Sequence, residues 1–516
     1  MLLNNYMSDK FYITTAIPYA NADPHIGFAM EILYADVMAR FQRMNGKDVY
    51  FLTGSDEHGQ KMLKTAKENG QPVEEFAAEK SAMYQNLADQ WNITNNDFIR
   101  TTEKRHMERA QKFWQTSQES GDIYKKEYAG LYCVGCESFK TEKDLVEGKC
   151  PDHPNLTLEV IKEENYFFRL SKYQEPLEFL YKENPGFVFP EAKYNEMHNI
   201  LKEGLDDVSI SRSKDKLTWG VPVPGDDSQV MYVWFDALTN YITALGWGSK
   251  DDALFKKYWP ADAHVIGKEI NRFHSLLWPA MLMSAGLDLP KQIAVHGWIT
   301  ADGQKMSKTV GNVINPLELV QKYPIEAVRY FFMKEIPFDN DGDFSYAKLE
   351  ERYNADLANG IGNLTNRILV MIEKYADGVI PEPSDADGDL IKFLTEKTWP
   401  DYVASMNTWK FSKALESVWQ FLTYCDQMIS DRQPWAMAKK GELQEVKNLL
   451  YHLAESLRHI AVMIWPVMPE TAEKIFAQLG LEASAEMAKP LSELQTWVQL
   501  VVGNKILKPE PLFPRF

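Results

Sequence analysis

The sequence predicts an α/β protein in which a doubly wound parallel sheet is split by an insertion and followed by an all-α helical bundle. Near the start, an apolar run at residues 11–16, a loop, a helical pattern over 25–43 and a second apolar run at 49–53 make a strand–helix–strand unit. Residues 120–225 break this pattern with many charges and short mixed segments. After about Tyr346, strand-like runs almost vanish and long helical periodicities dominate.

The first unit can be justified element by element. Residues 11–16 are apolar, β-branched and aromatic, which is typical of a buried strand. From His25 to Arg43, apolar side chains recur at helical spacing. The second strand, 49–53, leads directly into Gly54-Ser55-Asp56-Glu57-His58-Gly59. Because open α/β sheets bind ligands at the carboxyl ends of their strands, this turn is predicted to belong to a site.

The remaining segments follow in order. The α/β pattern resumes with apolar segments at 231–235, 263–267 and 292–297. Helical periodicity then spans 349–375, 411–429 and 443–463, with a Pro- and Asp-rich loop at 381–388. These patterns predict five parts: the first half of the sheet domain (8–120), the insertion (121–228), the second half (229–310), a linking region (311–350) and the helical domain with its tail (351–516).

Composition bounds the class of protein. With 516 residues, 45% hydrophobic and 25% charged, the chain is an ordinary globular protein of several domains. No apolar stretch is long enough to span a bilayer and the first residues do not resemble a signal peptide, so we expect a soluble, cytoplasmic protein without membrane contact. The net charge of -17 argues mildly against nucleic-acid binding, although an acidic enzyme can present a local basic face.

The cysteines indicate a metal site. Three of the four cysteines lie in one short segment, as Cys133-Val134-Gly135-Cys136 and Cys150-Pro151-Asp152-His153. Two such knuckles can offer four ligands tetrahedrally to Zn²⁺, and four protein ligands leave no open position for a substrate. We therefore predict one structural Zn²⁺ held by Cys133, Cys136, Cys150 and His153. The alternative is a set of reduced surface cysteines.

Two short motifs favour a triphosphate site. Pro24-His25-Ile26-Gly27-Phe28 opens the first predicted helix, and Lys305-Met306-Ser307-Lys308-Thr309 follows an apolar run that ends at Ile299. Helix N-terminal N–H groups and ammonium groups both bind anionic oxygens. Alone, each motif is also consistent with a solvated loop. Both together, in this order and each after a strand-like run, favour one site that only the fold can assemble.

Other segments have an ordinary structural interpretation as well as a functional one. The aromatic runs at 232–238 and 273–279 are, by themselves, more often core than pocket. Asn363 and Arg367 share a helix face, and Trp435 follows Pro434 at a predicted helix edge. An exposed Trp can stack on a base, and Arg can bind base edges or phosphates. Exposed Asn and Arg are nevertheless common, and most Trp side chains are core.

The two triphosphate motifs resemble the ATP-binding motifs of class I aminoacyl-tRNA synthetases, usually H-I-G-H and K-M-S-K-S. Along essentially the whole chain, the sequence resembles bacterial methionyl-tRNA synthetases. The segments that carry this resemblance are residues 16–21 (AIPYAN), 53–59 (TGSDEHG), 232–237 (YVWFDA), 266–269 (IGKE), 273–275 (FHS) and the ending 509–516 (PEPLFPRF). The resemblance implies a Rossmann-like catalytic domain and an anticodon-binding helical bundle.

The resemblance also implies specific site residues. The methionine pocket falls on Ile17, Tyr19, Asp56, Trp234, Ala237, Leu238, Tyr241, Ile270 and His274, with Asp56 at the α-ammonium. The ATP site falls on His25, Gly27, Phe28, Lys305, Ser307 and Lys308, of which His25, Lys305 and Lys308 are the catalytic residues. The anticodon-reading positions fall on Asn363, Arg367 and Trp435, and the knuckle matches members that carry one zinc.

The chain departs from the family at three positions. Phe28 replaces the second histidine of the first motif, which implies weaker ATP contact. Leu238 replaces a common proline, and Thr309 keeps the hydroxyl of the usual serine. The chain stops near Phe516 with no appended β-barrel of the kind that dimerises some members, so the resemblance implies a monomer.

The implied reaction is that of a methionine–tRNA ligase. With Mg²⁺ helping, the methionine carboxylate attacks the α-phosphorus of ATP, and a ribose hydroxyl of tRNA(Met), initiator or elongator with a CAU anticodon, then takes the methionyl group. Two alternatives stay open: a class I synthetase for another apolar amino acid, and a non-enzymatic RNA-binding relative with a damaged ATP site.

Overall fold

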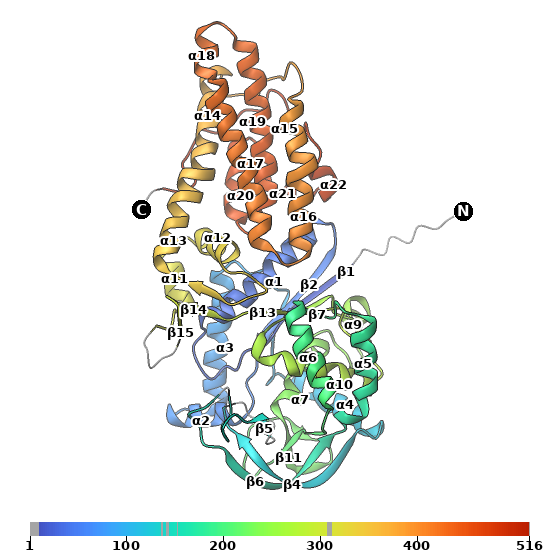
Figure 1. The fold of residues 1–516 in the computed structure, drawn as a ribbon. Coiled ribbons are helices and arrows are strands. Elements are labelled where there is room, and N and C mark those ends of the chain that lie inside the picture. The colour runs from blue at the N-terminus through green and yellow to red at the C-terminus, as the bar shows by residue number, and fades with distance from the viewer. Residues whose placement is uncertain (1–9, 136–137, 141–143, 152, 307–311, 515–516) are drawn as a thin grey trace, which may run out of the picture. The chain divides into compact units, whose positions relative to one another are not determined.

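A computed structural model describes residues 10–135, 138–140, 144–151, 153–306 and 312–514 (Figure 1). The chain divides into two compact units. The first comprises Met1–Ala35 and Val49–His296, and the second comprises Asp36–Asp48 and Gly297–Phe516. Helix α1 (Ile26–Met44) begins in the first unit and ends in the second.

The first unit is built on a six-stranded sheet with the order β3-β2-β1-β12-β13-β7. Its strands are β1 (Lys10–Thr15), β2 (Asp48–Ser55), β3 (Asp97–Arg100), β7 (Val188–Phe189), β12 (Ala263–Gly267) and β13 (Ile293–His296). β2 pairs with β3, β1 with β12, β12 with β13 and β13 with β7, each in parallel. The predicted doubly wound parallel sheet is confirmed.

Helices connect these strands in the α/β manner. Those of the first unit after α1 are α2 (Gln60–Glu68), α3 (Val73–Gln90), α4 (Lys104–Glu119), α5 (Gln174–Glu183), α6 (Glu191–Glu203), α7 (Val233–Ala237), α8 (Asn240–Thr243), α9 (Ala253–Tyr258) and α10 (Trp278–Ser284). The 3₁₀ turns η2 (Leu170–Tyr173) and η3 (Lys268–Ile270) and the π-helical turn η4 (Phe273–Leu277) join them. The apolar segment at 231–235 is therefore largely helical, because α7 begins two residues after Met231.

The predicted insertion contains two antiparallel sheets. One has the order β5-β4-β6-β8 and is dominated by the long pair β4 (Ile123–Cys133) and β6 (Glu159–Phe168), with β5 (Ser138–Lys140) and β8 (Val208–Ser209) at its edges. The other consists of β10 (Pro222–Val223), β11 (Asp226–Met231) and β9 (Ser211–Ser213). Strand β7, which also lies within 121–228, instead joins the parallel sheet of the first unit.

The second unit is mainly helical, as predicted. A small sheet, β15-β14-β16, is formed by Gln304–Lys305, Ile299–Ala301 and Gly342–Phe344. Its helices are α11 (Pro316–Lys322), α12 (Ile325–Glu335), α13 (Tyr346–Arg352), α14 (Asn363–Tyr375), α15 (Gly388–Lys392), α16 (Trp399–Asn407), α17 (Phe411–Arg432), α18 (Pro434–Lys439), α19 (Leu443–Ile464), α20 (Pro469–Gln478), α21 (Ala483–Met487) and α22 (Leu491–Leu494), with π-helical turns at Tyr353–Gly362 and Phe393–Thr398. Helices α14, α17 and α19 pack on one another (Figure 1).

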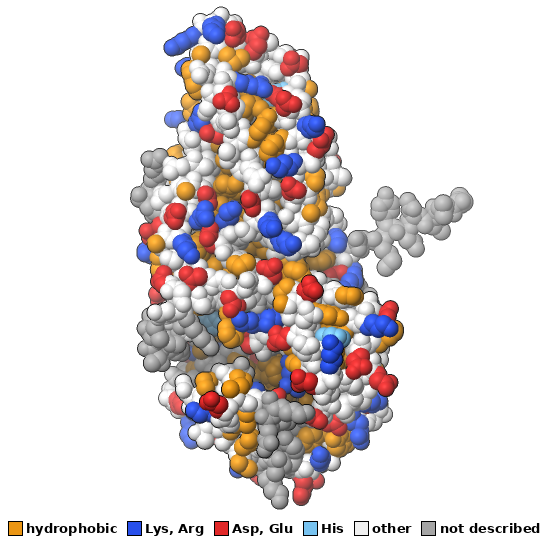
Figure 2. Space-filling view, in the orientation of Figure 1, with side chains coloured by type: hydrophobic (Ala, Val, Ile, Leu, Met, Phe, Trp, Pro, Cys, Tyr) orange, Lys and Arg blue, Asp and Glu red, His pale blue; other side chains and the backbone are white. Residues whose placement is uncertain are grey.

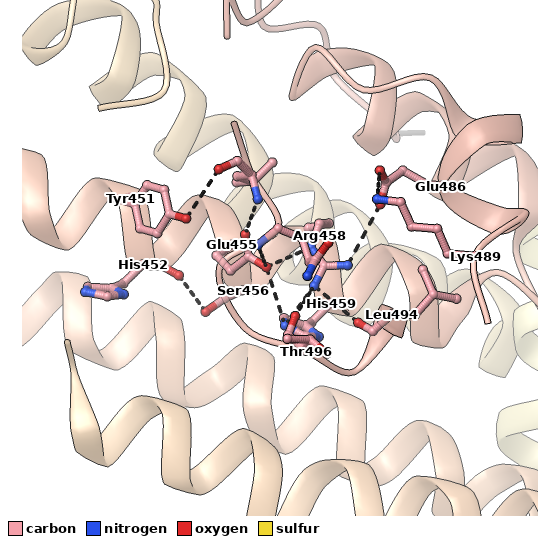
Figure 3. Close-up of polar contacts among 12 residues, drawn as sticks. Tyr451, His452, Glu455, Ser456, Arg458, His459, Glu486, Lys489, Leu494 and Thr496 are labelled. Carbon is pink, nitrogen blue, oxygen red and sulfur yellow. Dashed lines mark hydrogen bonds and ion pairs between the residues drawn. The ribbon is translucent and has the colours of Figure 1, made fainter. Parts of the chain in front are cut away.

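Helix α19 holds the chain near its end through two fully buried charges (Figure 3). Arg458 Nε donates to Glu455 at 2.8 Å. Arg458 Nη2 donates to the carbonyls of Leu494 and Thr496 at 3.2 and 3.0 Å, and Glu455 accepts the N–H of Leu500 at 2.9 Å. Buried charges are tolerated when they are paired and hydrogen-bonded, as these two are. Because their remaining hydrogen bonds go to backbone groups of residues 494–500, the network fixes that segment against α19.

Charged side chains of both signs are mixed on the surface. On the face drawn in Figure 2, Lys and Arg side chains are interspersed with Asp and Glu side chains over the helices of the second unit. Among the described residues, none of the helices is both long enough and apolar enough to cross a membrane.

Candidate functional site

Tyr19 and Asp56 are brought together where β1 and β2 end. The two residues form a parallel bridge, in which the Asp56 N–H donates to the Pro18 carbonyl at 2.9 Å. The Asp56 side chain is buried, and its Oδ1 accepts the His58 N–H at 3.3 Å and the Thr101 hydroxyl at 3.4 Å. Parallel strands thus place a buried carboxylate at the sheet edge where ligands bind.

The neighbouring Glu57 has a structural role. It is fully buried, and its carboxylate accepts Arg100 Nε at 2.6 Å and Nη2 at 3.1 Å. The hydroxyls of Ser81 on α3 and Thr102 also donate to it. With its oxygens occupied by these donors, Glu57 fixes the turn that presents Asp56.

An aromatic wall faces this turn from α7 and η4. The Trp234 ring stacks on Phe273, with centroids 4.0 Å apart and planes 5° apart. Tyr19 and His274 both meet the Trp234 ring edge to face, at 6.3 and 6.2 Å. Tyr241 lies 2.7 Å from His274, measured from Oη to Nε2. The structure therefore brings these predicted pocket residues from four separate elements into one cluster.

The Tyr241–His274 pair is electrically neutral. His274 Nδ1 lies 3.0 Å from the Ile270 carbonyl, which can only accept, so Nδ1 carries the proton and Nε2 accepts from the Tyr241 hydroxyl. Burial lowers the pKa of His274 to about 4 and raises that of Tyr241 well above its usual value. Near neutral pH the cluster thus presents an uncharged, mostly apolar surface.

The remaining predicted pocket residues are aliphatic. Ala237 and Leu238 are buried, and Ile17 and Ile270 are partly buried and pack against the core of the first unit. Gly54 on β2 allows close packing against β3, because a Cβ at position 54 would lie 2.1 Å from the Ile99 carbonyl oxygen. Any larger residue at position 54 would push β2 and β3 apart.

His25 caps the N-terminus of α1. Its Nδ1 accepts the Gly27 N–H at 3.1 Å, and its carbonyl accepts the Phe28 N–H at 3.1 Å. The imidazole is exposed, so its Nε2 can donate to a ligand. Phe28, in contrast, is buried, with its ring edge to face against Tyr84 at 5.1 Å.

The predicted metal ligands lie together at the end of β4. Ligand atoms of Cys133, Cys150 and His153 are all within 4.8 Å of one another, and Cys133 Sγ is 3.9 Å from His153 Nδ1. Tetrahedral Zn²⁺ with bonds of about 2.3 Å to sulfur and 2.0–2.1 Å to nitrogen requires a separation of about 3.6 Å. These three residues could therefore hold a metal ion. Cys136 lies outside the described residues.

The knuckle geometry depends on Gly135. A Cβ at this position would lie 2.4 Å from His153 Cγ, so only glycine lets the imidazole approach the first knuckle this closely. Sequence spacing alone does not show this requirement, since glycine is common in loops.

The three predicted anticodon residues lie on helices of the second unit. Asn363 is the exposed first residue of α14. One turn later, Arg367 donates through Nη1 to Asp426 on α17. Trp435, on α18, keeps 42% of its surface exposed and is not core. An aromatic ring and polar side chains are thus available at the surface.

A family model described as tRNA synthetases class I (M) matches residues 11–156 and 153–369, and a model of the anticodon-binding domain of tRNA ligases matches 394–503. Methionine–tRNA ligase of Brucella suis is 43% identical over 98% of both chains, and that of Thermotoga maritima is 45% identical over 98% of this chain and 80% of its own. The chain belongs to the class I methionyl-tRNA synthetases.

Solved structures agree with this synthetase family. Mycobacterium tuberculosis methionyl-tRNA synthetase in complex with methionyl-adenylate superposes with a TM-score of 0.93 at 39% identity, covering 98% of this chain and 100% of that one. The free form of the same enzyme gives 0.87 at 36% identity, covering 99% of each chain. The predicted family, fold class and enzyme class of this synthetase are confirmed.

The lysine loop of this synthetase is only partly described. Lys305 is the last residue of β15 and pairs with Thr300 on β14. Ser307, Lys308 and Thr309 lie outside the described residues. Their assignment to the ATP site therefore stays a prediction from the sequence.

Sequence reasoning about this synthetase missed a buried cluster of His58, Asp236 and His106. Asp236 accepts from His58 Nδ1 at 2.7 Å and from His106 Nε2 at 2.8 Å. His58 and Asp236 lie in segments that the family resemblance draws attention to, but nothing in the sequence marks His106, on α4.

Proposed function

We propose that this synthetase activates L-methionine with ATP to give methionyl-adenylate and pyrophosphate, and then transfers the methionyl group to tRNA(Met) with release of AMP. The observation that carries the proposal is a buried carboxylate, Asp56, beside an uncharged cluster of aromatic and aliphatic side chains. An amino acid with an ammonium group and a long apolar side chain fits this combination.

Each end of methionine has a partner among these side chains. The Asp56 carboxylate would bind the α-ammonium by a charge-assisted hydrogen bond. The thioether would lie among Trp234, Tyr241 and His274, lined by Ile17, Ala237, Leu238 and Ile270. Within the described residues, the buried indole N–H of Trp234 has no hydrogen-bond acceptor, so it is available to a ligand. The methionine carboxylate then remains for the attack on phosphorus.

The ATP-binding roles follow from charge and orientation. His25 Nε2 can donate to phosphate oxygens, and the positive end of the α1 dipole, capped by His25, favours an anion there. Lys305 and Lys308 would stabilise the charge that develops on the phosphates, and Ser307 would contribute a hydroxyl. Mg²⁺ bound with ATP supplies further charge neutralisation. Because the Phe28 ring packs against Tyr84 and its N–H donates to the His25 carbonyl, Phe28 would serve the nucleotide by fixing the start of α1.

Methionine-dependent ATP–pyrophosphate exchange tests the proposed function against its alternatives. We expect exchange with methionine and none above background with isoleucine, leucine or valine at the same concentration. Exchange with another apolar amino acid would indicate a different specificity. No exchange with any amino acid, despite binding of tRNA, would indicate an RNA-binding relative without catalytic activity.

We propose that the metal is one structural Zn²⁺ and that Cys136 is its fourth ligand. Two sulfur donors and one imidazole, with ligand atoms within 4.8 Å of one another, favour zinc over magnesium, which prefers oxygen. Metal analysis of the purified protein should give about one zinc per chain. Cys150→Ser should reduce this value strongly and lower the Tm, because structural zinc stabilises the fold.

Cys425→Ser provides the matched control for the zinc prediction. Cys425 is fully buried in α17, and burial raises the pKa of its thiol to about 12. The thiol therefore stays protonated near neutral pH, whereas metal ligands are thiolates. This variant should keep its zinc. Zinc well below one per chain in the unmodified protein would contradict the proposal.

We propose that Asn363, Arg367 and Trp435 read the CAU anticodon of tRNA(Met). Trp435→Ala should lower charging of tRNA roughly 10- to 100-fold, because stacking a base on an aromatic ring contributes about 1–3 kcal/mol. Methionine-dependent exchange should change little, since it needs no tRNA. Both rates are measured on the same preparation.

Phe179→Ala is the control for this variant, because Phe179 is an exposed aromatic residue of the first unit. It should leave both rates unchanged. If Trp435→Ala reduces exchange and charging equally, the anticodon role is rejected. The monomeric state and the cytoplasmic location of this synthetase stay predictions from the sequence.

A further inference from the structure

The cluster of His58, Asp236 and His106 joins three elements of the first unit. His58 lies in the turn between β2 and α2, Asp236 on α7 and His106 on α4. All three side chains are almost completely buried. Each oxygen of Asp236 meets one imidazole, at 2.7 Å from His58 Nδ1 and 2.8 Å from His106 Nε2. None of the three takes part in the reaction steps described above.

The chemistry of the cluster makes it rigid. Because Asp236 is an acceptor when ionised, both imidazoles donate an N–H to it. Burial opposes ionisation of Asp236, but His58 and His106 outweigh it and hold the pKa of Asp236 at about 2. His106 is held from its other side, with Nδ1 2.8 Å from the Thr243 hydroxyl. Charge-assisted bonds of this length, shielded from water, fix the separation of the elements they join.

The turn that contains His58 and the helix α7 that contains Asp236 carry opposite ends of the methionine site. His58 is two residues after Asp56, and its backbone N–H donates to Asp56 Oδ1 at 3.3 Å. Asp236 is two residues after Trp234 and directly precedes Ala237. The His58–Asp236 bond therefore ties the ammonium-binding carboxylate to the helix that supplies the side-chain wall.

We propose that Asp236 is a positioning residue that, through His58, sets the distance between Asp56 and the aromatic cluster around Trp234 and thereby determines methionine affinity. This inference rests on the proposed function. Methionine is bound at both ends, so a shift of one end relative to the other forces its flexible side chain out of the rotamer that fits both partners. Displacements of about 1 Å can reduce the efficiency of a site by as much as 100-fold.

Asp236→Asn tests this role. The amide keeps the shape of the side chain but offers one acceptor instead of two, so one imidazole must lose its bond or change its tautomer, and both bonds lose the assistance of the negative charge. We expect the methionine KM in ATP–pyrophosphate exchange to rise about 10-fold or more, with the ATP KM within about two-fold of the unmodified value. His58→Leu should raise the methionine KM in the same way. His58→Asn, whose amide N–H can replace that of Nδ1, should recover part of the loss.

Asp122→Asn separates positioning from general stability. Asp122 is another fully buried carboxylate of the same unit, and it accepts from Lys172, Tyr173 and Ser284. It contacts none of the proposed methionine-site residues through these bonds. This variant should lower the Tm while leaving the methionine KM unchanged.

Three outcomes would overturn the inference: an unchanged methionine KM in Asp236→Asn, a parallel rise in both KM values, or no difference between His58→Leu and His58→Asn. Should Asp236→Asn fail to fold, the two His58 variants decide by themselves. A failure of the proposed function is recognised separately, because Asp56→Asn would then also leave the methionine KM unchanged.

Discussion

Asp56→Asn should reduce kcat/KM for methionine in ATP–pyrophosphate exchange by roughly 100-fold or more. The substitution removes the negative charge opposite the methionine ammonium, and losing one partner of a desolvated charge pair costs about 2–5 kcal/mol. The amide oxygen can still accept from His58 N–H and the Thr101 hydroxyl, so the turn should keep its shape. The ATP KM should stay nearly constant.

The control for Asp56→Asn is again Asp122→Asn, which removes a buried carboxylate elsewhere in the same unit. Thermal unfolding of both variants shows whether lost activity follows lost stability. A loss in Asp56→Asn that affects the ATP KM alone would assign Asp56 to the nucleotide instead of methionine.

Lys308→Ala should slow adenylate formation by about 100-fold or more, while methionine binding measured without ATP stays close to that of the unmodified protein. Charge develops on the phosphates as the carboxylate attacks, so a lysine that matters in the transition state affects kcat more than KM. Single-turnover formation of methionyl-adenylate measures the chemical step directly.

Lys322→Ala is the matched control for Lys308→Ala. Lys322 lies at the end of α11 with its ammonium over the Tyr323 ring at 4.9 Å. Removing this cation should leave adenylate formation unchanged, which distinguishes the lysine loop from a general effect of charge. A Lys308 variant that changes only the methionine KM would identify Lys308 as a bystander to the chemistry.

Periodicity predicted the long elements well and the short ones poorly. The apolar run at 11–16, the helical pattern over 25–43 and the run at 49–53 correspond to β1, α1 and β2. Of the helical patterns after Tyr346, 411–429 and 443–463 correspond to α17 and α19, and 349–375 covers the end of α13, a π-helical turn and α14. Long elements repeat their apolar positions several times, whereas the two residues of β7 carry no period at all. Pairing with β13 alone makes Val188–Phe189 a strand of the parallel sheet.

The functional site also combines residues that the sequence identified with chemical states that only the fold determines. Knuckle spacing marked Cys133, and a polar turn after the second strand marked Asp56, whereas Trp234 and His274 were assigned through the family resemblance. Tertiary structure decided their chemical states. Burial makes His274 neutral, and its two ring nitrogens meet the Ile270 carbonyl and the Tyr241 hydroxyl. Neither the burial nor the contact with Tyr241, 33 positions away, can be read from the segment around His274.

By itself, the sequence determined the family, the α/β and helical parts and the types of side chain at the site, because those depend on local pattern and motif spacing. Only the tertiary structure decided that Trp435 is exposed, that Phe28 is buried against Tyr84, and that His106 reaches Asp236 across 130 positions of the chain. Hydrogen bonds and burial arise between elements that are distant in the chain, so they leave no periodic signal in either segment.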